Sequence, residues 1–356
     1  MNYLLIFTLI VPTLLVANDF TGRYTREKKL AKSYKVTADA KLLIENKFGN
    51  VEITPWDRDE ISIEVVIRTT GTNESKVEDK LDDIDVSFNG TKYVVSAKTH
   101  IESNSNWFNW FNSNVSYKIN YYVHVPVTND LDIQNKYGDT YISESKGKIN
   151  LTHDYGTIIL GSLYNDAVNI DMDYSKLEAD YMKQAIINVD YTDISIDEIH
   201  TLDLESDYGH IQVGKSLMIN YDMDYGSISI GAVNKIVGNS DYTDVDIEQL
   251  GSTAQLSADY GKIAIKSLSS LFDKISIDTD YTGIKIGYSE DSNFSFNINT
   301  KYTDVNGIEG DRFNLHYQNQ KTTSAQYKGD YGTTPSKSHM ELNTSYGNIT
   351  LRKKFN

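Results

Sequence analysis

The chain has 356 residues, a formal net charge of −16 at neutral pH and no cysteine. This length is enough for one large hydrophobic core or two ordinary ones, and the absence of cysteine excludes disulfide bonds, a thiol nucleophile and a lipid attached through sulfur. The negative charge argues against nucleic acid and anionic lipid as partners. Only four prolines accompany 26 tyrosines, and this composition favours β-strands.

The start of the chain has the features of a targeting segment. Residues 1–17 contain no charged side chain, and their apolar run of about 14 residues is too short for a comfortable bilayer span. The small residue Ala17 is followed by polar Asn18 and Asp19. We predict a secretory signal peptide over residues 1–17, with a retained membrane anchor as the alternative. Because no second apolar run reaches spanning length, we expect no integral membrane span after signal removal. The protein should be exported to the periplasm, the outer-membrane surface or the extracellular space.

Residues 18–122 differ from the rest of the chain and are expected to form a small N-terminal cap. Apolar residues alternate with polar ones in three stretches, which predicts strands at residues 36–44, 51–53 and 61–68, with a bend at Phe48-Gly49. Repeat proteins need such a cap because it covers an otherwise open strand edge.

A helix and a hairpin are predicted within this cap. The polar stretch from Asn73 to Leu81 has apolar residues four apart and begins with a suitable capping side chain, which predicts a short helix. Residues 84–88 and 93–97 alternate and flank Asn89-Gly90, which predicts a β-hairpin. The cap is therefore expected to be of mixed α+β composition.

The segment 103–114, SNSNWFNWFNSN, places Trp107, Phe108, Trp110 and Phe111 among asparagine and serine. The turn-forming neighbours predict a loop. An exposed aromatic patch is typical of a contact with a ligand, a protein or a membrane. The alternative is a hydrophobic plug in which the aromatic side chains fold over the end of the repeats. We take these four residues as candidate binding residues.

Residues 123–356 contain a repeat marked by a tyrosine and a following small residue. The spacing between successive tyrosines is constant from Tyr174 to Tyr242 and becomes slightly longer after that. The tyrosines are Tyr137, Tyr155, Tyr174, Tyr191, Tyr208, Tyr225, Tyr242, Tyr260, Tyr281 and Tyr302, with Tyr331 and Tyr346 after them.

Apolar residues alternate on both sides of each tyrosine. Ile194 and Ile196 lie three and five positions after Tyr191, and Leu202 and Leu204 lie six and four positions before the next tyrosine. This period of two predicts two short strands per repeat, each with one buried face. The small residue after the tyrosine suits a tight bend between the strands.

A single repeat is too short to bury its own apolar face, so successive repeats must stack, each adding about 4.8 Å. We therefore predict an all-β protein in which residues 123–356 form a parallel β-helix, or β-solenoid, with short coils behind the α+β cap. We expect it to be right-handed. An antiparallel meander is the rival fold, but it would need hairpin turns between the strands.

Two stretches of the chain resemble a known group of proteins. They are LLIENKFGNVEITPW at Leu42–Trp56 and VHVPVTNDLDIQNKYGDTYI at Val123–Ile142, together with the helix and hairpin between them. They resemble the exported bacterial adhesin-like domains of unknown function, which are relatives of the adhesin group named head GIN. The resemblance covers nearly the whole mature chain. It implies a parallel β-helix in the cell envelope and carries no catalytic residues.

An aspartate precedes the tyrosine in eight successive repeats, and Lys136 and Lys301 occupy the same phase on either side. Carboxylates about 4.8 Å apart repel one another and could attract cations, Ca²⁺ being the most natural. The favoured interpretation is a solvated face whose aspartates cap the bends. The column comprises Asp154, Asp173, Asp190, Asp207, Asp224, Asp241, Asp259 and Asp280, of which Asp190, Asp207, Asp224 and Asp241 are the candidate cation-attracting residues.

The tyrosine column also has two interpretations. It could be a platform on which sugar rings stack, or a column of half-buried corner aromatics stacked along the repeat axis. We favour the second, because the tyrosines share the parity of the buried aliphatic residues before the bend.

Catalysis finds little support in the sequence. The seven histidines are scattered, and no zinc-protease, nucleophile-elbow or P-loop pattern occurs. We predict no catalytic residue, no metal site and no cofactor. The predicted function is an adhesin-like binding or scaffold module of the bacterial cell envelope, with an envelope or surface glycan or protein as partner.

The alternative is a polysaccharide-acting enzyme, a lyase or glycosidase on a β-helix, because carboxylate pairs such as Asp190 and Asp193 are plentiful. A role in envelope stress or signalling is a third option that no residue decides.

Overall fold

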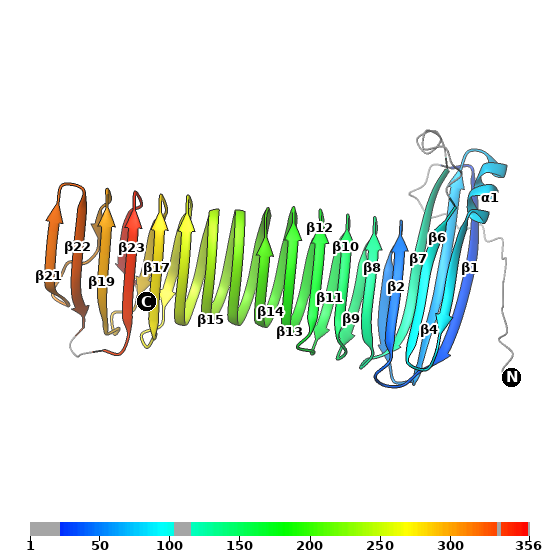
Figure 1. The fold of residues 1–356 in the computed structure, drawn as a ribbon, viewed down its shortest axis with the longest axis horizontal. Coiled ribbons are helices and arrows are strands. Elements are labelled where there is room, and N and C mark those ends of the chain that lie inside the picture. Colours follow the sequence, from blue (N-terminus) through cyan, green and yellow to red (C-terminus); the bar gives the residue numbers. More distant parts are fainter. Residues whose placement is uncertain (1–21, 103–114, 333–335, 355–356) are drawn as a thin grey trace. The chain divides into compact units, whose positions relative to one another are not determined.

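The computed structural model describes residues 22–102, 115–332 and 336–354. The chain divides into two compact units, Met1–Lys176 and Leu177–Asn356. The described residues are mostly β-strand and contain one helix (Figure 1). This confirms the predicted all-β class. The predicted signal peptide, residues 1–17, lies outside the described residues.

Three long strands of the N-terminal unit form an antiparallel group. β1 (Tyr24–Lys35) pairs along its whole length with β4 (Glu60–Gly71), and β4 pairs with β7 (Val115–Pro126). The sequence pattern does not predict β1, because none of its side chains is buried and lysines interrupt its alternation. The strand predicted at residues 36–44 begins only at Lys41.

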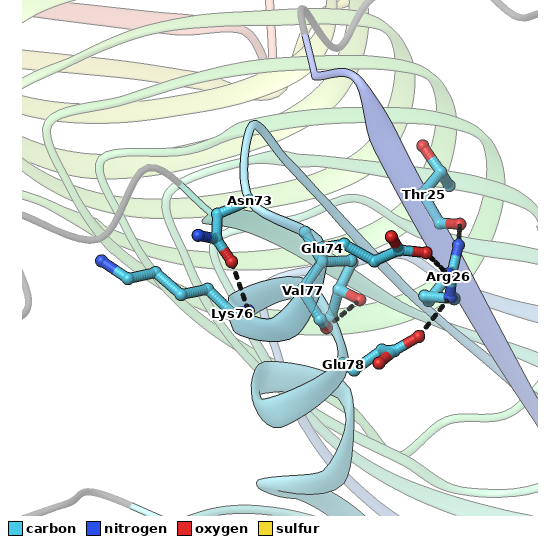
Figure 2. A network of polar contacts seen from close by, with 8 residues as sticks. Thr25, Arg26, Asn73, Glu74, Lys76, Val77 and Glu78 are labelled. Carbon is cyan, nitrogen blue, oxygen red and sulfur yellow. Dashed lines mark hydrogen bonds and ion pairs between the residues drawn. The ribbon is translucent and has the colours of Figure 1, made fainter.

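The predicted helix is confirmed as α1 (Glu74–Asp82). The side chain of Asn73 accepts a hydrogen bond from the backbone N–H of Lys76 at 3.1 Å, which satisfies one of the free donors at the helix start (Figure 2). Arg26 of β1 donates to the carboxylate of Glu78 at 3.0 Å. The helix is therefore held at its N-terminus and against the neighbouring strand.

The predicted hairpin is formed by two antiparallel strands, β5 (Ile84–Gly90) and β6 (Val94–Ile101). The predicted position of its turn is wrong, because Asn89 and Gly90 are the last residues of β5. The turn follows them, where the N–H of Thr91 donates to the carbonyl of Val94 at 2.8 Å. Gly90 is needed for packing instead, since a Cβ there would lie 2.3 Å from the ring of Tyr34.

The repeats of the N-terminal unit supply strands to two parallel ladders. Like positions of consecutive repeats pair, as in the row Leu131, Ile149 and Val168. The first ladder has the order β6, β2 (Lys41–Lys47), β8 (Asp130–Lys136), β10 (Ile149–Asp154) and β12 (Val168–Asp173). The second has the order β7, β3 (Val51–Trp56), β9 (Thr140–Ser145) and β11 (Thr157–Leu163).

The C-terminal unit continues the same kind of pairing. Thr192 pairs with Gly209, and Asp244 pairs with Lys262, each partner lying one repeat further along the chain. All of these pairs are parallel and in the register that the tyrosine spacing predicts. The strands are β13 (Lys176–Asp190), β14 (Thr192–Ser206), β15 (Gly209–Asp259), β16 (Lys262–Leu268), β17 (Lys274–Asp280) and β18 (Gly283–Tyr288).

The last strands do not stack in chain order. β23 (His339–Ser345) pairs in parallel with both β17 and β19 (Phe294–Lys301) and so lies between them (Figure 1). β24 (Ile349–Lys353) likewise lies between β18 and the short β20 (Val305–Asn306). Beyond β19 the pairing becomes antiparallel, with β22 (Ser324–Tyr331) and then β21 (Phe313–Lys321).

The expectation that successive tyrosine-marked segments stack in sequence is therefore wrong at this end. Tyr346 occupies the corner between Tyr281 and Tyr302, with ring centroids 4.6 and 4.9 Å away. Tyr331 marks no corner and is 3% exposed within an aromatic cluster that includes Phe294 and Phe313. The sequence pattern predicts a corner at Tyr331, but its ring is instead buried against other aromatic side chains.

The residues predicted to form the core are buried. The aliphatic side chains three and five positions after the tyrosines are at most 3% exposed from Ile194 to Ile286. The alternation of buried and exposed side chains along each strand leaves the other face in solvent. The repeats thus have an aliphatic inner face and a polar outer face.

Ile228, which is fully buried in β15, tests the contribution of one inner position. We expect Ile228→Ala to lower the free energy of unfolding by about 2–5 kcal/mol, because it removes packed methyl groups and leaves a cavity. Denaturant unfolding followed by circular dichroism measures this. Ser229→Ala, at the exposed neighbour, should change stability by less than about 0.5 kcal/mol. An equal loss in both variants would contradict the assignment of faces.

Candidate functional site

The tyrosine corners have an unusual backbone. Tyr225 and Tyr242 have φ values of 57° and 49°, in the left-handed region that side chains with a Cβ rarely adopt. The following residue must be small or able to bond locally. A Cβ at Gly226 would lie 2.0 Å from the carbonyl oxygen of Gly209, and the hydroxyl of Thr243 donates to the carbonyl of Asp241 at 2.9 Å. These contacts explain why glycine, serine and threonine follow the tyrosines.

The tyrosine side chains form stacked columns on the outside of the corners. Neighbouring rings are 4.6 to 5.2 Å apart at their centroids and within 9° of parallel. In the N-terminal unit the column contains Phe48, Tyr137, Tyr155 and Tyr174. In the C-terminal unit it runs in the order Tyr191, Tyr208, Tyr225, Tyr242, Tyr260, Tyr281, Tyr346 and Tyr302.

The stacking limits what these rings can bind. From Tyr208 to Tyr346 both faces of each ring are covered by neighbouring rings, so only ring edges and hydroxyls meet solvent. The arrangement matches a column of half-buried aromatics rather than a platform for sugar rings. Tyr302 at the column end differs, because among the residues that the structure describes only Tyr346 stacks on it, and its side chain is 58% exposed.

The structure places each of the four candidate aspartates directly before a tyrosine corner. Asp190 is the last residue of β13, Asp207 follows the end of β14, and Asp224 and Asp241 lie within β15. Asp207, Asp224 and Asp241 are exposed, and Asp190 is partly buried. Each is followed by an exposed tyrosine. At Tyr191, Tyr225 and Tyr242 the left-handed backbone interrupts the strict alternation of faces. No group of three or more His, Asp or Glu side chains among the described residues is arranged to hold a metal ion.

The aspartates of the column nevertheless influence one another. Partial desolvation, and then the charges of Asp241, Asp207 and Asp222, raise the pKa of Asp224 above its usual value of 3.8. The stretch of the column around Asp224 is therefore a region of concentrated negative charge, in which Asp207, Asp224 and Asp241 are open to solvent.

A groove of about 760 Å³ crosses the outward face of six strands at the C-terminal end of the second unit. The strands lie in the order β15, β17, β23, β19, β22 and β21. Side chains of like phase form two rows across them. The first row is Ser257, Asp278, Asn343, Asn299, Gln326 and Asn319, and the second is Asp259, Asp280, Ser345, Lys301, Ser324 and Lys321.

Hydrogen bonds connect part of the first row. The amide of Asn299 donates to the side-chain oxygen of Asn343 at 2.7 Å, and the amide of Asn343 donates to the carboxylate of Asp278 at 3.3 Å. These bonds fix the orientation of two amides and leave further donors and acceptors directed to the groove. Such a surface suits a ligand rich in hydroxyl groups.

The sequence pattern does not predict this groove. In the sequence Lys301 stands out only as an exception at the aspartate phase. The groove residues of β21, β22 and β23 come from segments that do not follow the repeat spacing. The sequence signal for the groove is that Ser345 and Lys301 replace aspartate at the position before the corner tyrosine. The predicted aromatic binding residues Trp107, Phe108, Trp110 and Phe111 lie outside the described residues.

No family model matches the sequence, and no curated protein matches it. A proposed cell adhesion protein from Clostridium sporogenes is 10% identical, with 92% of this chain and 100% of that chain covered and a TM-score of 0.20. A proposed lipid-binding protein from Parabacteroides distasonis is 12% identical, with 91% and 96% covered and a TM-score of 0.37. A proposed adhesin from Parabacteroides merdae is 8% identical, with 91% and 96% covered and a TM-score of 0.35. The adhesion proteins among these matches agree with the adhesin-like resemblance of the sequence, but TM-scores this low assign no site or ligand.

Tyr225 lies within the column and tests the stacking. We expect Tyr225→Ala to lower the free energy of unfolding by about 1–3 kcal/mol, because two ring pairs of about 0.5–1.5 kcal/mol each are lost. Tyr225→Phe is the matched control and should be close to neutral, since it keeps the ring and the backbone strain. Denaturant titration compares the two. Equal destabilisation by alanine and phenylalanine would show that the hydroxyl, and not the stacked ring, stabilises the corner.

Asp224→Asn tests the repulsion within the aspartate column. Because folding raises the pKa of Asp224, ionisation of this carboxyl costs stability above that pKa, and the cost disappears as the pH falls below the usual value. We expect the variant to have a higher melting temperature than the wild type at pH 7 and the same melting temperature near pH 2.5. Asp197→Asn, outside the column, is the control. A melting temperature at pH 7 that does not rise would contradict the repulsion.

Proposed function

We propose that this chain is an exported, non-enzymatic binding or scaffold module of the bacterial cell envelope. In this proposal residues 1–17 are a signal peptide, residues 18–122 are an N-terminal cap and residues 123–356 are a right-handed β-solenoid. Parallel pairing between strands one repeat apart, at Thr192 with Gly209 and Asp244 with Lys262, supports the solenoid.

The observation that carries the binding function is the groove of the C-terminal unit. Its two rows present amide, hydroxyl, carboxylate and ammonium groups on an outward-facing sheet surface. Rows of fixed hydrogen-bonding side chains on rigid strands are suited to recognising an extended polar partner. An envelope or surface glycan or protein is the proposed class of partner.

The proposed export rests on the sequence of residues 1–17. The described part of the chain contains no helix with the length and apolar character needed to cross a membrane. The periplasm, the outer-membrane surface and the extracellular space are the proposed compartments.

Two further surfaces belong to the proposal on sequence grounds. The aromatic segment with Trp107, Phe108, Trp110 and Phe111 is a second candidate contact. The aspartate column at Asp190, Asp207, Asp224 and Asp241 is a candidate for loose attraction of cations, which its exposed carboxylates and the raised pKa of Asp224 support.

One observation favours the rival function, a polysaccharide-acting enzyme. The groove contains three carboxylates, of which Asp259 and Asp280 are paired across adjacent strands and Asp278 lies two positions before Asp280. Two carboxyl groups about 5 Å apart are the arrangement of a retaining glycosidase. The two functions therefore differ in whether a bound glycan is cleaved.

The test is to apply the purified protein to a glycan array and to incubate it with envelope polysaccharides. We expect retention on at least one glycan or envelope component and no release of reducing ends or unsaturated sugars. Release of such products that Asp280→Asn abolishes, and that the control Asp197→Asn does not, would replace the binding module with the enzyme. Failure to bind any glycan or envelope protein would also contradict the proposal.

A further inference from the structure

The second row of the groove changes sign along its length. Asp259 and Asp280 lie at one end, Lys301 and Lys321 lie towards the other, and serines separate the lysines from each other and from the aspartates. The side chains at the aspartate phase thus change from negative to positive beyond β23, which is where the strands stop following chain order. In a protein with a net charge of −16, this change creates a local site for an anionic group.

The two lysines are available to such a group. Both are exposed, and neither forms a salt bridge with any residue that the structure describes. They lie two strands apart, which corresponds to about 10 Å at the usual strand spacing. Two ammonium groups at that separation could contact one extended anionic ligand, either at one group between them or at two groups along it.

The first row of the groove supplies hydrogen-bonding partners for the hydroxyl groups of a ligand. Asn343 and Asn299 are oriented by their own hydrogen bonds, and Gln326 and Asn319 continue the row beside the lysines. Amides both donate and accept, as sugar hydroxyls do. A ligand that satisfies both rows therefore carries many hydroxyls and at least one negative charge.

An aromatic ring lies at the corner beside this end of the groove. The backbone N–H of Tyr302 donates to the carbonyl of Thr323 at 2.8 Å, next to the groove residue Ser324. One face of the Tyr302 ring stacks on Tyr346, and the side chain is the most exposed tyrosine of the column. The other face has no aromatic neighbour among the described residues, and an exposed aromatic ring can pack against the apolar face of a sugar ring.

From these juxtaposed features we propose that the groove binds an acidic oligosaccharide. Its carboxylate or sulfate lies at Lys301 and Lys321, its hydroxyls bond to the amide row, and one sugar ring packs on Tyr302. Asp259 and Asp280 repel a second negative charge at the other end, which fixes the direction of the ligand and disfavours a uniformly charged nucleic acid. This inference rests on the proposed binding function and names the ligand class of its groove.

The test is titration of the purified protein with 3′-sialyllactose, which carries a single carboxylate at one end, and with neutral lactose, together with an array of acidic and neutral oligosaccharides. We expect binding to acidic oligosaccharides that weakens as sodium chloride is raised, and weaker binding of the neutral probe. Lys301→Gln with Lys321→Gln should weaken binding of the acidic probe at least about tenfold, because two charge-assisted contacts are lost.

A second pair of lysines provides the matched control. Lys235→Gln with Lys285→Gln makes the same change of net charge at exposed positions outside the groove and should leave binding within about twofold. Tyr302→Ala should weaken binding of the acidic probe several-fold, whereas Tyr302→Phe should retain it. Circular dichroism verifies that every variant is folded.

The outcomes separate this inference from the proposed function. Absence of binding to every acidic oligosaccharide, or equal weakening by the groove pair and the control pair, would overturn the inference. In that case retention of neutral glycans or envelope proteins on the array would leave the binding module standing. Cleavage of the probe would overturn the binding module itself.

Discussion

Parallel backbone hydrogen bonding between strands one repeat apart is the interaction on which the rest of this structure depends. It places like positions of neighbouring repeats directly opposite each other, at about 4.8 Å. Once the register is set, every side-chain type becomes a column or row. Isoleucine and leucine form the inner face, tyrosines form the corners, and aspartates directly precede the corners. A chain without cysteine relies on this repetition, because each repeat buries its apolar residues only against its neighbours.

The left-handed backbone at the tyrosine corners allows the aspartate column and the tyrosine column to lie side by side on the solvent-exposed surface. A strand that simply continued would place Asp241 and Tyr242 on opposite faces. The positive φ at Tyr242 interrupts this alternation, so that both side chains reach solvent, while Val245 and Ile247 after the corner again point inward. The backbone cost of the corner is offset by stacking on the rings of Tyr225 and Tyr260.

The sequence was most informative where structure is determined locally. The constant spacing of the tyrosines and the alternating isoleucines predicted the register of β14 on β15 and the buried set from Ile194 to Ile286, since both follow from short-range periodicity. The capping side chain of Asn73 identified α1 for the same reason.

The features that could not be predicted depend on pairing between distant segments. β1 carries no buried side chain and is recognisable only through its partner β4. The groove is formed in part by β21, β22 and β23. The positions of these strands depend on pairing with strands far away in the sequence, which the repeat period does not predict. Lys301 was visible in the sequence as a break in the aspartate series, but its partner Lys321 was not.

The insertion of β23 between β17 and β19 has a consequence for biogenesis. A chain that is synthesised from its N-terminus can add one repeat after another as it emerges, but β19 meets its parallel neighbour only after residues 339–345 have appeared. Until then β17 exposes an unsatisfied edge, and the hairpin of β21 and β22 is attached to a strand that is not yet docked. Residues 339–353 therefore complete this unit, and the pairing of β17, β18 and β19 depends on their arrival.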